Sequence, residues 1–148
     1  MAERKWEKYI LTEPPDIDKY PKDPDRPKMT PILMQNGMNL KGAFHVNVMW
    51  VNPGPNPGVY EAHYHPHDEM IGFIGTDPNN PGELGAEAIL WIEDEKYVIT
   101  KSFLAYFPRG LVHCPLTVNK VTRPILHFDI QLSRHKPKFS WAKDLPKK

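Results

Sequence analysis

Three histidines and a carboxylate fall within seven residues of this chain, in the run His63-Tyr64-His65-Pro66-His67-Asp68-Glu69. On an extended strand, side chains two positions apart point to the same side, so His63 and His65 can direct their imidazoles at one ion. Glu69 opens the next apolar run and can face the same ion from a neighbouring strand. Two imidazoles and a carboxylate suit Fe, Mn, Co, Ni or Zn, so the run predicts a site for one divalent transition metal.

The third histidine of the run is expected to stay outside this site. Pro66 cannot donate a hydrogen bond to a sheet and favours a turn, which leaves His67 on that turn. A slipped set of His65, His67 and Glu69 would also alternate, but the proline disfavours it.

A second segment, 107–115, can supply a fourth ligand. Its Pro108-Arg109-Gly110 turn delivers His113 to the start of the next strand. A ligand from a distant strand is what a metal site inside a small β-barrel requires.

The elements that must hold these residues are predicted to be strands. Proline makes up 17 of the 148 residues, a share that disfavours long helices. Only residues 1–10 show helical spacing, over one or two turns. Apolar and β-branched runs recur between turn-forming segments, which is typical of an all-β sandwich or barrel. The runs are 31–35, 43–51, 58–65, 69–75, 86–93, 96–100, 103–107 and 123–132.

Both motifs resemble those of the cupin family, G-x5-H-x-H-x(3,4)-E-x6-G and G-x5-P-x-G-x2-H-x3-N. The first matches at His63, His65 and Glu69, with Gly58 and Gly75 each one position out of place. The second matches at Pro108, Gly110 and His113. Ser102 stands in place of its first glycine and Thr117 in place of its last residue, an asparagine. The resemblance covers about residues 43–132, and the departures affect turns rather than metal ligands.

The resemblance implies an all-β fold, a double-stranded β-helix of the jelly-roll type, with His63, His65, Glu69 and His113 converging on one divalent metal. We expect residues 33–133 to form this cupin domain, preceded by a Pro-rich arm over 1–32 and followed by a tail over 134–148. The arm is predicted to be extended, and the sequence leaves open whether it covers the domain, reaches a partner subunit or is disordered.

The cupin family includes enzymes of many kinds as well as binding proteins, so the fold does not settle the reaction. The first hypothesis is metal-assisted isomerase, decarboxylase or lyase chemistry on a small oxygenated substrate, a carboxylate or an enediol. The alternatives are a dioxygenase using Fe or Mn and a non-enzymatic small-ligand binder or sensor.

Strand alternation nominates residues around such a substrate. His127 and Asp129 share one face of their strand and would serve as proton carriers if that face is inward, or form a solvated stripe if it is outward. His45 alternates with apolar neighbours in the same way, so its set lines either the cavity or an outer surface.

Four further candidates are weaker. Tyr106 and Arg109 flank Pro108 near the expected mouth, where Arg109 could bind a substrate carboxylate or be a surface residue. Tyr60 and Trp91 are candidates for the pocket wall or for the core. The lone Cys114 follows His113 and is expected to be a small buried residue on the opposite strand face.

Composition narrows the partners. The net charge is +1, from 19 Lys and Arg against 18 Asp and Glu, so no nucleic-acid partner is expected. The start of the chain has no apolar signal region and no stretch approaches a membrane span, so a cytoplasmic protein is expected. Exposed sheet edges and the long arm favour a homodimer.

Overall fold

The computed structural model describes residues 5–16, 29–54, 60–134 and 140–141. The N-terminal part holds one short 3-10 helix, η1 (Glu7–Tyr9), where one or two helical turns were predicted. The strands are β1 (Met29–Gln35), β2 (His45–Val51), β3 (His63–Tyr64), β4 (Glu69–Ile74), β5 (Glu83–Ile92), β6 (Glu95–Lys101), β7 (Phe103–Phe107), β8 (His113–Asn119), β9 (Ile125–Gln131) and β10 (Ser140–Trp141). The all-β prediction is confirmed.

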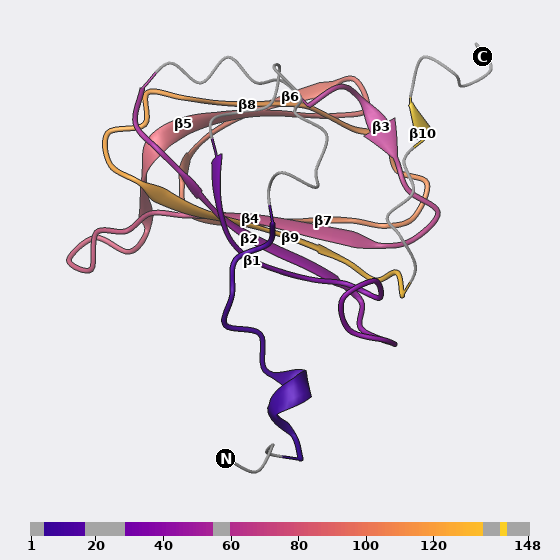
Figure 1. Cartoon of the computed structure of the whole chain (residues 1–148). Coiled ribbons are helices and arrows are strands. Elements are labelled where there is room, and N and C mark those ends of the chain that lie inside the picture. The colour runs from indigo at the N-terminus through magenta and orange to yellow at the C-terminus, as the bar shows by residue number, and fades with distance from the viewer. Residues whose placement is uncertain (1–4, 17–28, 55–59, 135–139, 142–148) are drawn as a thin grey trace.

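The strands form two five-stranded antiparallel sheets that face each other (Figure 1). One sheet has the order β1-β2-β9-β4-β7 and the other β10-β3-β8-β5-β6. Neighbours in both sheets are often distant in sequence, as where β9 lies between β2 and β4. This crossing of the chain brings the two predicted motifs together: β4 pairs with β7, and β3 pairs with β8.

The core between the sheets follows from the period-two alternation of the strands. In β5 the side chains of Leu84, Ala86, Ala88 and Leu90 are buried, and the residues between them are more exposed. Buried residues of the other sheet, among them Phe73, meet this face. The space between the sheets therefore holds an apolar core, which reaches the buried polar side chains at Phe107 and Cys114.

Two strands were absent from the predicted runs. The sequence indicated β8 only as the strand that begins at His113, because Pro115 interrupts its pattern. Alternation also fails at its start, since Cys114 has a positive φ of 68° and both His113 and Cys114 are buried. The short β10 pairs with β3, placing Trp141 opposite His63.

The predicted domain limits of 1–32, 33–133 and 134–148 stay a prediction. Strand β1 begins at Met29, within the stretch assigned to the arm. Residues 17–28 of that arm, with three of its six prolines, lie outside the described residues, as do 135–139 and 142–148 of the tail. Among the described residues, no helix has the length and apolar character needed to cross a membrane.

Gly75, directly after β4, lies against the start of β5. A methyl group in place of its hydrogen would overlap the backbone carbonyl oxygen of Glu83. The Gly75 N–H donates to the Ser102 hydroxyl (3.0 Å), which fixes the strand end in place.

We therefore expect Gly75→Ala to lower the unfolding free energy by about 1–3 kcal/mol, because backbone atoms must move to admit the methyl group. The matched control is Gly82→Ala, where the added carbon meets no atom within 4 Å. Thermal denaturation should show a loss of several degrees for the first variant only. Equal melting temperatures for the two variants would contradict the close approach at Gly75.

Candidate metal centre

The four predicted ligands lie together in the interior. His63, His65, Glu69 and His113 are all buried, and one potential ligand atom from each lies within 4.8 Å of all the others. His63 is in β3, Glu69 opens β4 and His113 opens β8, with His65 in the connection between β3 and β4. Segments 44 residues apart in sequence are thus combined at one point.

Strand pairing sets this arrangement. His63 and His113 are direct partners across β3 and β8. The Gly110 N–H donates to the His65 carbonyl (2.9 Å), which ties the turn before β8 to the first motif. Gly110 has a φ of 84°, so this turn uses the left-handed conformation that glycine adopts without steric cost.

Asp68 joins the same two segments from outside. Its carboxylate accepts hydrogen bonds from the Arg109 N–H and from the Tyr106 hydroxyl, both at 2.9 Å. Its carbonyl accepts from the Leu132 N–H at 3.0 Å. The Arg109 N–H and the Tyr106 hydroxyl hold the pKa of this carboxyl below its usual range, so Asp68 stays charged and keeps both bonds at neutral pH.

Backbone carbonyls orient two of the imidazoles. Nδ1 of His63 lies 2.6 Å from the Glu61 carbonyl oxygen, and Nδ1 of His113 lies 3.0 Å from that of Leu111. Because a carbonyl only accepts, each Nδ1 carries the proton and donates. A neutral imidazole then has its lone pair on Nε2, which is the form that ligates a metal.

Glu69 brings a carboxylate oxygen against these rings. Its Oε2 lies 2.7 Å from Nε2 of His113 and 3.3 Å from Nε2 of His65. Within the described part of the chain, neither Oε2 nor Nε2 of His113 has a hydrogen-bond partner of good geometry, although both atoms are buried. Two buried acceptors at this distance repel each other unless a cation or a proton lies between them. The donor set therefore fits a divalent transition-metal ion.

The charge states agree with this fit. Burial by itself would raise the pKa of Glu69, but the neighbouring His113 and His65 rings lower it well below the usual range. Burial lowers the pKa of His63 to about 4. At neutral pH the centre therefore presents an ionised carboxylate and a neutral His63 imidazole, as metal ligation requires.

The histidine of β9 lies deeper in the interior. His127 is buried, its Nδ1 donates to the Gly72 carbonyl (2.9 Å), and its ring stacks on Phe73 with centroids 4.2 Å apart. Burial lowers its pKa to about 4, so the ring is neutral at physiological pH. His127 therefore faces inward but lies apart from the four-residue cluster.

Two other candidates form a pair beside the cluster. Nε2 of His45 and Oδ2 of Asp129 face each other at 3.6 Å, and the His45 side chain is buried. Burial raises the pKa of the Asp129 carboxyl above its usual value. This pair lies on neighbouring strands, β2 and β9, of the sheet that carries Glu69.

The remaining candidates do not belong to the four-residue cluster. Tyr106 is 60% exposed and bonded to Asp68, and Arg109 meets Asp68 through its backbone. Tyr60 packs against the apolar core, and its hydroxyl lies 3.7 Å from the Met29 sulfur. Trp91 is half-buried beside the inward-facing Leu90.

Sequence reasoning missed Gln131, a buried polar residue that contacts Glu69 of the cluster. It is 1% exposed, and its amide contacts Glu69, Asp129 and His67. The signal was present in the sequence, because the alternation that pairs His127 with Asp129 continues two residues further to position 131.

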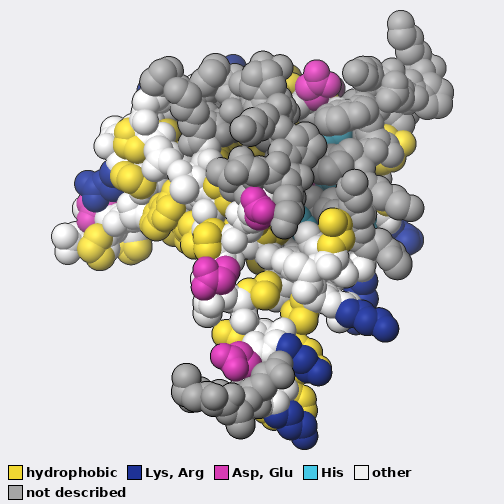
Figure 2. Space-filling model, in the orientation of Figure 1, with side chains coloured by type: hydrophobic (Ala, Val, Ile, Leu, Met, Phe, Trp, Pro, Cys, Tyr) yellow, Lys and Arg dark blue, Asp and Glu magenta, His cyan; other side chains and the backbone are white. Residues whose placement is uncertain are grey.

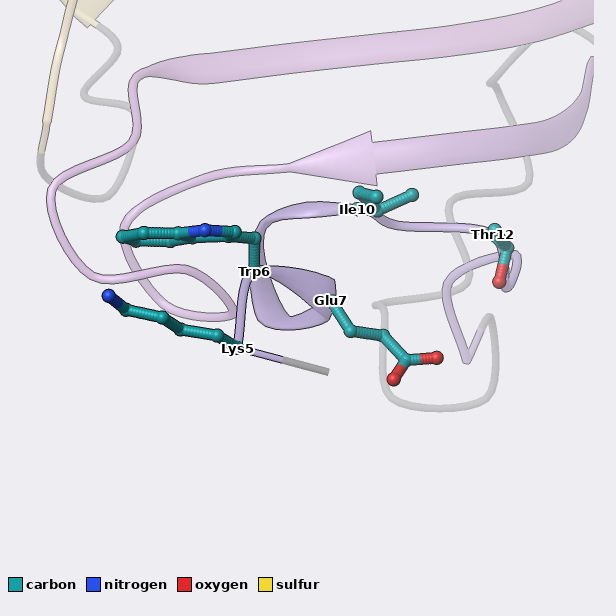
Figure 3. A pocket seen from close by; sticks show the side chains of 5 residues that line it. All are labelled: Lys5, Trp6, Glu7, Ile10 and Thr12. Carbon is teal, nitrogen blue, oxygen red and sulfur yellow. The ribbon is translucent and has the colours of Figure 1, made fainter. Parts of the chain in front are cut away.

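A separate recess of about 300 Å³ lies at the N-terminal segment (Figure 3). It is lined by Lys5, Trp6, Glu7, Ile10 and Thr12, and the Lys5 ammonium lies 4.5 Å from the centre of the Trp6 ring. These residues contribute nothing to the metal cluster.

Comparison with solved structures shows the fold. An uncharacterised conserved protein with a double-stranded β-helix domain from Klebsiella pneumoniae is 17% identical, with 97% of this chain and 99% of that chain covered and a TM-score of 0.52. An oxalate oxidase in complex with the substrate analogue glycolate is 18% identical, with 89% of this chain and 61% of that chain covered and a TM-score of 0.52. The chain thus spans less than two thirds of the oxidase.

The structure of Peruvianin-I, a cysteine peptidase from Thevetia peruviana latex, is 15% identical, with 94% of this chain and 80% of that chain covered and a TM-score of 0.55. No protein-family model matches the sequence, and no curated protein does. The chain therefore has the double-stranded β-helix fold that the resemblance implied. Because neighbours of such different activities share it, the fold alone carries no activity over to this chain.

We expect His113→Ala to lower the metal content of the purified protein by at least ~tenfold, because loss of a ligand should exceed the 10–100-fold effect of losing an outer contact. Elemental analysis of protein purified without chelator measures this content. His127→Ala is the control, since it also removes a buried histidine but leaves the cluster intact. Unchanged metal content in the His113 variant would overturn the assignment.

Proposed function

We propose that this protein is a metal-dependent enzyme that acts on a small oxygenated substrate, a carboxylate or an enediol, by isomerase, decarboxylase or lyase chemistry. The observation that carries the proposal is the buried cluster of His63, His65, Glu69 and His113, with ligand atoms within 4.8 Å of one another. When bound, a divalent ion at this centre supplies Lewis-acid polarisation of a substrate oxygen.

The polar residues beside the cluster support chemistry rather than a purely structural metal. The Asp129 carboxyl holds a proton more readily than a surface aspartate, because burial raises its pKa. Nε2 of His45 lies 3.6 Å from its Oδ2. In the proposed reaction these two atoms take up and return the substrate proton. His127 stays neutral and, with Phe73, closes the inner end of the site.

The carboxylate class has additional support from one structural neighbour. The oxalate oxidase is described with glycolate, a small hydroxycarboxylate, as a substrate analogue. The same neighbour favours a second candidate function, the oxidation of a small carboxylate using Fe or Mn. Oxygen dependence separates the two.

A panel of small carboxylates and enediols, followed by NMR, tests the proposal on protein loaded with Mn, Fe, Co, Ni or Zn. We expect substrate to be converted under strict anaerobiosis by the wild type and not by His113→Ala. Turnover that requires oxygen would overturn the proposal and favour the oxidase or dioxygenase. Saturable binding without conversion would overturn it in favour of a non-enzymatic binder or sensor.

We also propose that two copies associate through the outer face of the β1-β2-β9-β4-β7 sheet. The outward side chains of its inner strands are apolar and only partly buried: Val46, Val48, Trp50, Met70, Ile74, Leu126, Phe128 and Ile130. Trp6, Tyr9 and Ile10 are more than half exposed, on a segment where hydrophobic and basic side chains mix (Figure 2). An apolar sheet face of this kind is typical of an interface.

The cytoplasmic location and the absence of nucleic-acid and membrane partners stay predictions.

Light scattering at micromolar concentration should give a dimer mass for the wild type and a monomer mass for Val48→Asp, which places a charge at the centre of this face. Val98→Asp is the matched control, because Val98 is a 57% exposed strand valine of the other sheet. A single-subunit mass for the wild type would refute the dimer. Dissociation by Val98→Asp alone would refute the proposed face.

A further inference from the structure

We propose that Gln131 is a positioning residue that makes Glu69 a one-oxygen ligand, and that it couples the non-ligand His67 to the metal centre. This role rests on the proposed metal site and specifies how the protein sets its ligand strength. It begins from the register of the sheet, in which Gln131 of β9 is the direct partner of Glu69 in β4 and of His45 in β2.

The two oxygens of Glu69 have separate tasks. Oε1 accepts a hydrogen bond from the Gln131 amide nitrogen at 3.2 Å. Oε2 lies 2.7 Å from Nε2 of His113 and 3.3 Å from Nε2 of His65. The amide therefore holds one oxygen away from the cluster, and the carboxylate offers the other to it.

The Gln131 amide is fully used by its neighbours. Its nitrogen also donates to Oδ2 of Asp129 at 3.3 Å, and its oxygen lies 2.9 Å from Nε2 of His67. Since an amide oxygen only accepts, Nε2 of His67 is the donor. Both amide protons and the oxygen are thus engaged in a side chain that is 1% exposed, which fixes its orientation.

His67 in turn lies against a ligand. Its ring stacks on that of His65, with centroids 5.1 Å apart and planes 19° apart. His67 is therefore linked to the cluster in two ways, directly through this stack and indirectly through its hydrogen bond to Gln131. Outer contacts of this kind orient metal ligands and change metal affinity when removed.

The test measures Co²⁺ affinity by competition with a chromophoric chelator, together with the visible absorption spectrum of bound Co²⁺. Gln131→Met keeps the shape of the side chain and removes its hydrogen bonds. We expect about tenfold weaker binding and an altered spectrum, because Oε1 of Glu69 is released and the carboxylate can turn. Val118→Ala, which destabilises the core at a 2% exposed site away from the amide, should leave both readouts unchanged.

His67→Phe tests the coupling, because it keeps an aromatic ring against His65 and loses the donor to Gln131. We expect weaker Co²⁺ binding in the wild-type background and no further loss in the Gln131→Met background. Fully additive losses would overturn the coupling through the amide. Wild-type affinity and spectrum in Gln131→Met would overturn the positioning role while leaving the metal site standing. Absence of Co²⁺ binding by the wild type would overturn the site itself, and this role with it.

Discussion

A buried carboxylate facing buried imidazoles is the constraint on which the rest of this structure depends. Taking Glu69 out of water costs free energy that an apolar interior cannot return. Its Oε2 therefore needs a positive charge beside it. The nearby Nε2 atoms of His65 and His113 supply one only when a proton or a metal cation lies between them and Oε2. The neighbours of Glu69 follow from this need: Gln131 holds the other oxygen, and backbone carbonyls turn the rings of His63 and His113 toward the centre.

The two-sheet fold serves this constraint through its register. Sheet order places β9 between β2 and β4, so inward side chains of these strands line up in rows across the sheet. One row joins His45, Gln131 and Glu69. Another row, which holds His127 and Phe73, reaches the apolar core. The interior thus combines a polar cluster with an apolar core, so that a small barrel can bury polar groups and still keep its core.

Much of this site could be predicted from sequence because it depends on local spacing. The alternation of His63 and His65, the turn at Pro66 and the Pro-x-Gly turn before His113 are short-range features, and the four ligand candidates do lie together. The inward direction of His127 was left open, since alternation gives two faces but does not say which is buried. The pairing of strands could not be predicted, because nothing in the local sequence indicates that residue 131 lies opposite residue 69. The sequence also did not predict the failure of alternation at Cys114, where φ is 68°.

The fold therefore limits the possible reactions without deciding among them. The proposed metal centre is what most needs a direct test. Anomalous diffraction from crystals grown with Mn²⁺ would locate the ion itself. The proposed metal centre predicts one strong peak within coordination distance of Nε2 of His63, His65 and His113 and of Oε2 of Glu69. A peak elsewhere, or a hydrogen-bonded carboxylate–imidazole cluster with no peak in saturating Mn²⁺, would contradict it.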